Sequence, residues 1–171
     1  YFASSAQMWF KDGGEFEYKS MEADYNIRNK NSDELGAIDA LNRMVDDGEE
    51  KRPVVLVASG DRYTSDCSIP VITGCPTVLG WHTHEWLWHN SRQFYEEREA
   101  DERLIYMGTD RELTQKMLEK YNVKYVYIGK HEYEKYPEIQ NGILESLGEC
   151  VYSELCDDGQ MIEIIKIASG R

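Results

Sequence analysis

The segment 81–89 contains three of the chain's four tryptophans and three of its four histidines. Both residue types can do chemistry. Imidazole rings bind metal ions and transfer protons near neutral pH, and indole rings stack on sugars or lie at membrane interfaces. A glutamate at position 85 adds a carboxylate to the same stretch. This segment is therefore the first candidate for a functional site.

A metal site is one interpretation of this segment. On an extended chain, His82 and His84 would place both imidazoles on the same side, and Glu85 or His89 would complete a zinc site. The helical zinc-protease pattern instead needs histidines four residues apart, whereas His84 and His89 are five apart. A metal-dependent hydrolase that uses His82, His84 and Glu85 is therefore kept as an alternative.

The tryptophans allow two further interpretations. Trp81, Trp86 and Trp88 could be platforms on which a sugar ring stacks, or anchors at a membrane interface. Alternatively, they are core aromatic side chains, which is an ordinary role for an indole ring. The clustering of all three favours a binding site over a core.

The remaining reactive side chains form no recognised motif. Cys67 and Cys75 lie near the histidines in sequence, but neither has a nucleophile signature. The four cysteines match no metal spacing, and they allow three disulfide pairings among which the sequence does not choose. Disulfides from Cys67 to Cys75 and from Cys150 to Cys156 would close short loops, and buried thiols are the alternative. The stretch 59–62 lacks the glycine spacing of a nucleotide-binding loop, so we interpret it as a turn.

The composition excludes several classes of partner. The 171 residues carry a net charge of -13, which argues against nucleic acid and anionic lipid head groups, because both require a basic face. At 41% hydrophobic and 12% aromatic residues, the chain can bury one sizeable core and is not disordered. No run approaches the roughly 20 apolar residues of a transmembrane helix, and no series of basic, apolar and small residues typical of a signal peptide occurs in the sequence. The chain does not begin with Met, so we expect a processed protein or a domain of a longer one.

Helix and strand patterns alternate along the chain from residue 32. Apolar residues at helical spacing predict helices over 32–48 and 110–121. Charged residues of helical propensity predict another over 93–106, and a further helical stretch is expected over 132–147, interrupted near Pro137. Runs of β-branched and aromatic residues predict strands at 54–58, 76–81 and 123–129, and a hairpin of 149–155 with 161–167. The acidic run 96–103 is expected to be a solvent-exposed helix face.

This order of elements predicts a three-layer α/β domain over 32–171. The sheet is expected to be mostly parallel and Rossmann-like, with a C-terminal antiparallel hairpin. Residues 1–31 are expected to be an irregular lead-in. Parallel sheets place their sites at the carboxyl ends of the strands, which here are the loops after Ala58, Trp81 and Ile128. The segment 81–89, with its tryptophans and histidines, begins at the loop after Trp81.

Several longer motifs resemble one protein family. They are Thr73-Gly74 followed by 76–81, His84-Glu85-Trp86 with Trp88, Arg98-x-x-Asp101 leading to Ile105-Tyr106, and 121–129 with Glu132 and Tyr136. In this order they resemble the C-terminal soluble region of the DUF2298, or YYY-domain, multi-pass membrane proteins, over about Ser32 to Ile167. The chain departs from the family pattern at His89, where the family has Arg, and at His82-Thr83, where it has a Pro-Gly-like pair.

The resemblance implies a role at a membrane. The family's architecture is similar to that of the polytopic, GT-C type glycosyltransferases that use polyprenyl-phosphate sugars. It implies that 1–31 lead in from a preceding membrane region and that the domain lies on the extracytoplasmic side of the cell membrane. Its partners would be the transmembrane portion of the same polypeptide and a sugar or polyprenyl-phosphate-linked substrate, with no nucleic acid and no cofactor. In such enzymes the catalytic carboxylate belongs to the membrane half, so the isolated domain is expected to bind substrate and to be inactive alone.

The expected substrate-binding residues combine the family motifs with the aromatic segment. They are Gly74, Trp81, His84, Glu85, Trp88 and Arg98. Indole faces would stack on sugar, the Glu85 carboxylate would accept hydrogen bonds from hydroxyls, and Arg98 would pair with phosphate or support Glu85. Neither a catalytic residue nor a metal is assigned. A non-catalytic interaction domain is a further alternative, beside the hydrolase.

Overall fold

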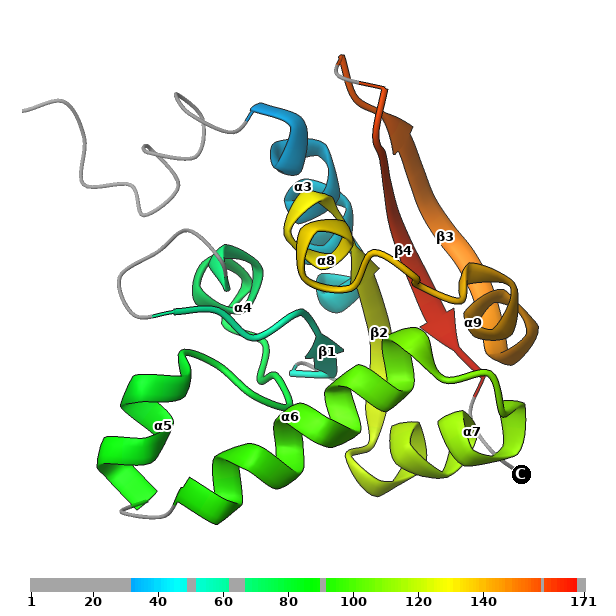
Figure 1. Ribbon diagram of the computed structural model, residues 1–171. Coiled ribbons are helices and arrows are strands. Elements are labelled where there is room, and N and C mark those ends of the chain that lie inside the picture. Colours follow the sequence, from blue (N-terminus) through cyan, green and yellow to red (C-terminus); the bar gives the residue numbers. More distant parts are fainter. Residues whose placement is uncertain (1–31, 49–51, 62–66, 90–91, 158, 169–171) are drawn as a thin grey trace, which may run out of the picture.

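The computed structural model describes residues 32–48, 52–61, 67–89, 92–157 and 159–168 (Figure 1). The expected lead-in, 1–31, lies outside the described residues. The helices are α3 (Ser32–Asp46), α4 (Ser68–Thr73), α5 (His82–His89), α6 (Arg92–Met107), α7 (Arg111–Lys120), α8 (Lys130–Lys135) and α9 (Asn141–Leu147). The strands are β1 (Val54–Leu56), β2 (Val123–Ile128), β3 (Gly148–Leu155) and β4 (Met161–Ile167).

Most helix boundaries follow from local sequence signals. The Asp110 carboxylate accepts hydrogen bonds from the backbone N–H groups of Glu112 and Leu113, at 2.9 and 3.1 Å, and so begins α7. Pro137, which has no N–H to donate, lies between α8 and α9. The predicted helices that correspond to α3, α6 and α7 are confirmed, and so is the interruption near Pro137.

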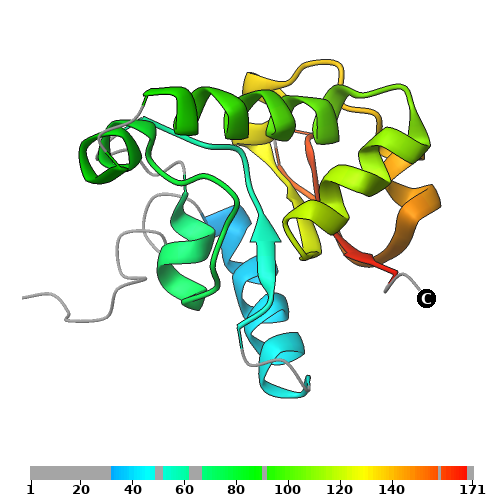
Figure 2. The same cartoon turned by 90° about the horizontal axis from the view of Figure 1, so that it is seen from below.

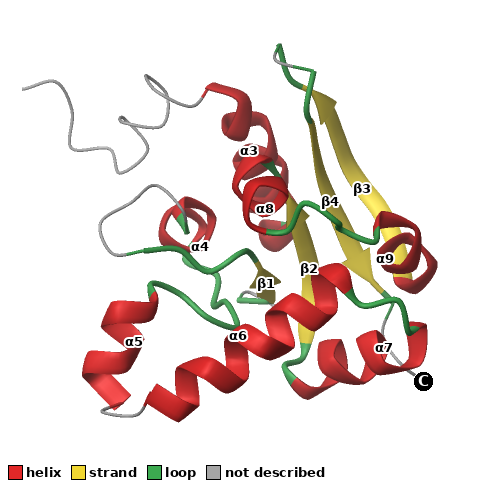
Figure 3. Cartoon of the chain, in the orientation of Figure 1, coloured by secondary structure: helices red, strands yellow, loops and turns green. Residues whose placement is uncertain are grey.

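The four strands form one sheet in the order β1-β2-β4-β3 (Figure 3). β1 pairs with β2 in parallel, and Val55 lies opposite Tyr125. β4 pairs antiparallel with β2, and with β3 it forms the predicted C-terminal hairpin. The α/β fold with a terminal antiparallel hairpin is therefore confirmed. In the described part of the chain, parallel pairing is confined to β1 and β2.

The predicted strand at 76–81 is wrong, because this segment is a loop between α4 and α5. Pro76 has no N–H for a strand ladder, although its carbonyl accepts a hydrogen bond from Val55 N at 2.9 Å. Gly80 weakens strand formation further, because it has no side chain to pack. The segment therefore lies beside β1 without joining the sheet, which is less parallel than the sequence predicted.

Helices cover both faces of the sheet, which gives the predicted three layers (Figure 2). On one face, α3 and α4 pack on the strands through a cluster that includes Ile38 and Ile69. On the other face, α6, α7 and α9 pack through a second cluster that includes Ile105. Because alternate residues of a strand point to opposite faces, Tyr125 belongs to the first cluster and Val126 to the second.

Helix α5 lies at one side of the molecule, where it packs against α6 (Figure 1). It continues the loop that follows α4, so that α4, this loop and α5 form one connected region beside the sheet. Within the described ranges, no helix is both long and apolar enough to cross a lipid bilayer.

Candidate functional site

The segment 82–89 folds as helix α5, not as an extended chain. The Trp81 carbonyl accepts hydrogen bonds from the backbone N–H groups of His84 and Glu85, at 2.9 and 3.1 Å, which begins the helix. Residues two apart in a helix point about 200° apart, so His82 and His84 face opposite directions. The zinc site that the sequence left as an alternative is therefore contradicted by the geometry of α5. In the described part of the chain, no three histidine, cysteine, aspartate or glutamate side chains are placed to hold a metal ion.

His82 connects α5 to the loop after β1. Its Nδ1 lies 3.2 Å from the Gly60 carbonyl oxygen, and its Nε2 lies 3.7 Å from the Asp61 carboxylate. The ring also lies against Tyr95 of α6, with the ring centroids 5.3 Å apart. These contacts position α5 beside the carboxyl end of β1.

A cavity of about 450 Å³ lies between α4, α5 and the loop that connects them. Its lining comprises Cys67, Pro70, Val71, Cys75, Pro76, Thr77, Gly80, Trp81, His84, Glu85 and Trp88. Four of the expected binding residues, Trp81, His84, Glu85 and Trp88, are in this lining. Their spacing of i, i+3, i+4 and i+7 places them on one face of a helix. The volume lies within the range of about 300–1,000 Å³ that is typical of small-molecule sites.

The cavity combines aromatic faces with one carboxylate. Trp81 is half-buried and packs against the first core cluster, and the His84 ring meets its edge, with centroids 5.3 Å apart and planes at 83°. Trp88 is 86% exposed and therefore lies on the rim. The Glu85 Oε2 atom lies 3.3 Å from His89 Nε2, one turn further along α5. Apolar stacking surface and a hydrogen-bond acceptor thus lie side by side.

The other two expected residues, Gly74 and Arg98, do not line the cavity. Gly74 ends α4 with φ of 67°, a left-handed conformation that favours glycine, and its N–H donates to the Pro70 carbonyl at 3.0 Å. Arg98 donates from Nη1 to the Val78 carbonyl at 2.6 Å, and its guanidinium lies 4.3 Å from the centroid of the Phe94 ring. Arg98 therefore supports the loop that leads to α5.

No disulfide joins any of the four cysteines, all of which lie in the described part of the chain. The two short-loop disulfides, Cys67 to Cys75 and Cys150 to Cys156, are therefore not formed. Cys67 and Cys75 are buried in the wall of the cavity, and Cys67 Sγ lies 3.8 Å from the Ala58 carbonyl oxygen. Such thiols pack as small apolar side chains.

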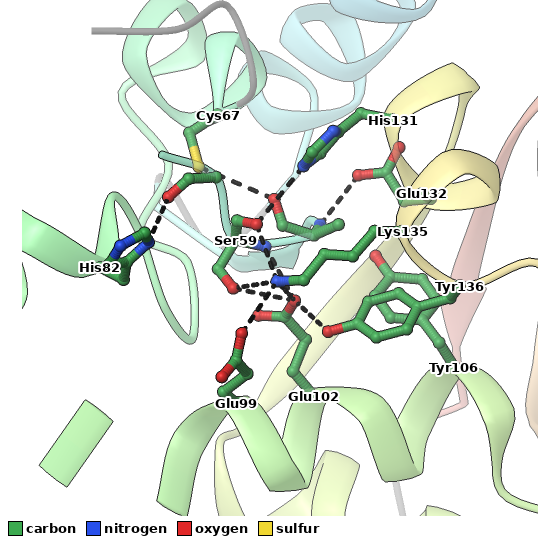
Figure 4. Close-up of polar contacts among 12 residues, drawn as sticks. Ser59, Cys67, His82, Glu99, Glu102, Tyr106, His131, Glu132, Lys135 and Tyr136 are labelled. Carbon is green, nitrogen blue, oxygen red and sulfur yellow. Dashed lines mark hydrogen bonds and ion pairs between the residues drawn. The ribbon is translucent and has the colours of Figure 1, made fainter. Parts of the chain in front are cut away.

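A cluster of buried polar side chains lies at the carboxyl ends of β1 and β2 (Figure 4). Glu102 of α6 is at its centre and is fully buried, so the prediction of an exposed acidic face is wrong at this residue. Its Oε1 atom accepts hydrogen bonds from Ser59 N, Ser59 Oγ, Lys135 Nζ and Tyr136 OH, at 2.8, 3.1, 3.2 and 2.8 Å. Burial raises the pKa of the Glu102 carboxyl, and the Lys135 charge opposes that rise.

Glu132 of α8 is the second buried carboxyl group of this cluster. Its Oε1 atom accepts a hydrogen bond from Ala58 N at 2.8 Å, and its Oε2 atom accepts one from Gly129 N at 3.0 Å. Burial raises the pKa of Glu132 to about 8, although the backbone N–H donors act in the opposite direction. Glu132 therefore bridges the backbone segments that follow β1 and β2.

The buried cluster positions the loop after β1. Lys135 Nζ donates to the Ser59 carbonyl at 2.8 Å and to the Ser59 hydroxyl at 2.6 Å. The next carbonyl, that of Gly60, is the one that His82 contacts. Because the Ser59 hydroxyl, the Lys135 ammonium and the Glu102 Oε1 atom bind one another, we interpret the cluster as a scaffold for α5.

The sequence contained a signal for the buried cluster. Glu102 lies three and four residues before Ile105 and Tyr106, which are both fully buried. This spacing places all three side chains on one face of α6. Glu132 and Tyr136 belong to the motifs quoted above. The contact of Tyr136 with Glu102, and those of Glu132 with the backbone, are visible only in the folded structure.

A second cavity, of about 580 Å³, lies at the opposite end of β2. Its lining includes Val123, the first residue of β2, together with Arg111, Lys124 and Gly148. None of the expected binding residues lies there. The cavity beside α5 is therefore the one that corresponds to the sequence-based hypothesis.

We compared the chain with protein-family models, curated sequences and solved structures, and a resemblance is found among the solved structures only. No protein-family model and no curated protein sequence matches the chain. Among solved structures, the chain is similar to the C-terminal globular domain of the oligosaccharyltransferase AglB-S2 from Archaeoglobus fulgidus. The identity is 13%, the TM-score is 0.42, and the match covers 78% of this chain and 95% of that domain. A likeness of this degree assigns neither an activity nor site residues.

Proposed function

We propose that the chain is the extracytoplasmic, substrate-binding domain of a membrane glycosyltransferase that uses polyprenyl-phosphate sugars. It contributes the binding of a sugar substrate, and the catalytic base belongs to the transmembrane portion of the same polypeptide. The proposal rests on the motif resemblance to the DUF2298 proteins and on the cavity beside α5. The backbone likeness to the oligosaccharyltransferase domain is too slight to support it.

The observation that carries the proposal is one face of α5. Trp81, His84, Glu85 and Trp88 follow one another at helical spacing and line the same cavity. The C–H faces of a sugar ring can stack on indole rings, and its hydroxyls can donate to a carboxylate. Core aromatic residues would be buried, whereas Trp88 is largely exposed on the rim.

The charges of the cavity favour the sugar portion of a substrate over a phosphate. Histidines aside, Glu85 is the one charged side chain among the described residues of the lining. A phosphate group needs a cation or several backbone N–H donors, and Arg98 lies outside the lining. The cavity therefore suits an uncharged, hydroxyl-rich group. A carboxylate such as Glu85 would orient that group by accepting its hydrogen bonds.

Tryptophan signals provide the test of this proposal. The chain contains Trp9, Trp81, Trp86 and Trp88, and each indole N–H gives its own signal in a nitrogen–proton NMR spectrum. Titration with a water-soluble, short-chain isoprenyl phosphate hexose should shift the signals of Trp81 and Trp88. Trp86, on the same helix but outside the lining, is the internal control. Shifts as large at Trp86 as at Trp88, or none at all, would contradict the proposed binding site.

A further inference from the structure

Four of the six exposed large apolar side chains in the described part of the chain lie on α4 and α5. They are Val71 at 63%, Trp86 at 50%, Leu87 at 61% and Trp88 at 86% exposed. We refer to these four side chains as the α4–α5 apolar surface. Exposed apolar groups that gather in one region indicate a surface that contacts a partner.

The geometry of α5 makes this surface broad. Successive helix residues point about 100° apart, so Leu87 points outward between Trp86 and Trp88, which flank it on either side of α5. Val71 of α4 and Trp88 both belong to the lining of the cavity, which joins the two helices into one region. The surface therefore borders the cavity through Val71 and Trp88.

The distribution of charge indicates what kind of partner fits. The chain has a net charge of -13, yet the segment 67–89 contains one acidic residue, Glu85, and no lysine or arginine. A partner with a strong charge of either sign would find no complementary group here. An interface that is polar but without net charge fits this region better.

We propose that the α4–α5 apolar surface lies on the interface of a bilayer of zwitterionic lipids. Tryptophan is enriched at membrane interfaces, where its ring is in the apolar zone and its N–H is hydrated. A second copy of the chain is the other occupant that would cover an apolar surface, and the experiment below distinguishes it from a bilayer.

This contact would place the cavity at the membrane surface. Val71 and Trp88, which line the cavity, would lie at the level of the lipid head groups. A lipid-linked sugar could then enter from the bilayer with its chain still in the membrane. This consequence rests on the proposed function, whereas the bilayer contact itself does not.

Vesicle binding tests the bilayer contact. The 171-residue chain is mixed with vesicles of pure phosphatidylcholine, and the bound fraction is measured by flotation. The wild type should bind, and binding should persist at high salt, because screening weakens charge attraction only. The double variant Trp86→Ser, Leu87→Ser should bind about tenfold more weakly, since two side chains no longer enter the interface.

The control is a second pair of exposed leucines on other elements. Leu113 of α7 and Leu155 of β3 are 40% and 66% exposed, and the variant Leu113→Ser, Leu155→Ser should bind vesicles as the wild type does. The proposal is wrong if the wild type does not bind phosphatidylcholine, if both double variants bind equally, or if binding requires an anionic lipid. A dimer that is lost on replacing Trp86 and Leu87, without vesicle binding, would also overturn it and would identify a second copy as the occupant.

The outcome is separable from that of the proposed function. Trp86 and Leu87 lie outside the lining of the cavity, so their replacement should leave binding of the soluble isoprenyl phosphate hexose unchanged. Glu85→Gln should weaken that binding and leave vesicle binding unchanged. Failure of one experiment therefore does not decide the other.

Discussion

Lys135 of α8 donates a hydrogen bond to the fully buried Glu102 carboxylate of α6, with Nζ 3.2 Å from Oε1. The same oxygen accepts from the backbone N–H of Ser59 at 2.8 Å. Helices α6 and α8, which are far apart in the sequence, are thereby both joined to the segment after β1. The position of α5, and of the cavity that it lines, depends on this junction.

Removal of the Glu102 charge should destabilise the fold. In Glu102→Gln, Lys135 faces a neutral amide, and an amide N–H can face a donor where the carboxylate oxygen accepts. The free energy of unfolding should therefore fall by about 2–3 kcal/mol. Urea denaturation measures this change. Glu99→Gln is the matched control, because Glu99 is on the same helix, 3.5 Å from the same ammonium group, but 39% exposed. It should cost less than about 1 kcal/mol, and equal costs would contradict a special role for Glu102.

Stability should depend on pH through Glu132. Its pKa in the folded chain is about 8, above its usual value of 4.5, because burial disfavours the charged form. The contribution of Glu132 is therefore fully present below about pH 4.5 and is lost as the pH rises toward about 8. Glu132→Gln cannot titrate. The free energy of unfolding of the wild type minus that of the variant should fall as the pH rises from about 4.5 to about 8. A difference that stays constant with pH would contradict the raised pKa of Glu132.

Two glycines should respond oppositely to alanine. At Gly148, where β3 begins, a Cβ atom would overlap the carbonyl oxygen of Lys166 in β4, so Gly148→Ala should destabilise the hairpin by about 2 kcal/mol. At Gly142 in α9, a Cβ atom meets nothing within 4 Å. Gly142→Ala should therefore stabilise the chain by about 0.5–1 kcal/mol. Thermal unfolding of both variants measures the signs, and the same sign for both would refute the packing described here.

The elements that carry local signals could be predicted from the sequence. Asp110 and Pro137 act within one turn of their own positions, and so they fix where α7 begins and where α8 and α9 separate. The segment 76–81 resembles a strand in sequence because its Val-Leu run has strand propensity. Whether a strand forms also depends on a partner with a matching edge, and that partner is far away in the sequence.

The candidate site was only partly accessible from the sequence. Clustering points to Trp81 and Glu85, but which side chains share a face depends on whether the segment is extended or helical. The metal-site alternative requires an extended chain at His82 and His84, whereas the segment folds as α5. The burial of Glu102 could not be read from an acidic run, since its partners Ser59 and Lys135 are 43 and 33 residues away.

The affinity of the chain for a water-soluble isoprenyl phosphate hexose tests the central claim most directly. Isothermal titration calorimetry would compare the wild type with Trp88→Ala and Trp86→Ala, which remove the same side chain from inside and outside the lining. The proposed sugar site predicts that Trp88→Ala weakens binding about tenfold or more and that Trp86→Ala leaves it unchanged. Equal affinities for the two variants, or no binding by the wild type, would contradict the assignment of a sugar-binding domain.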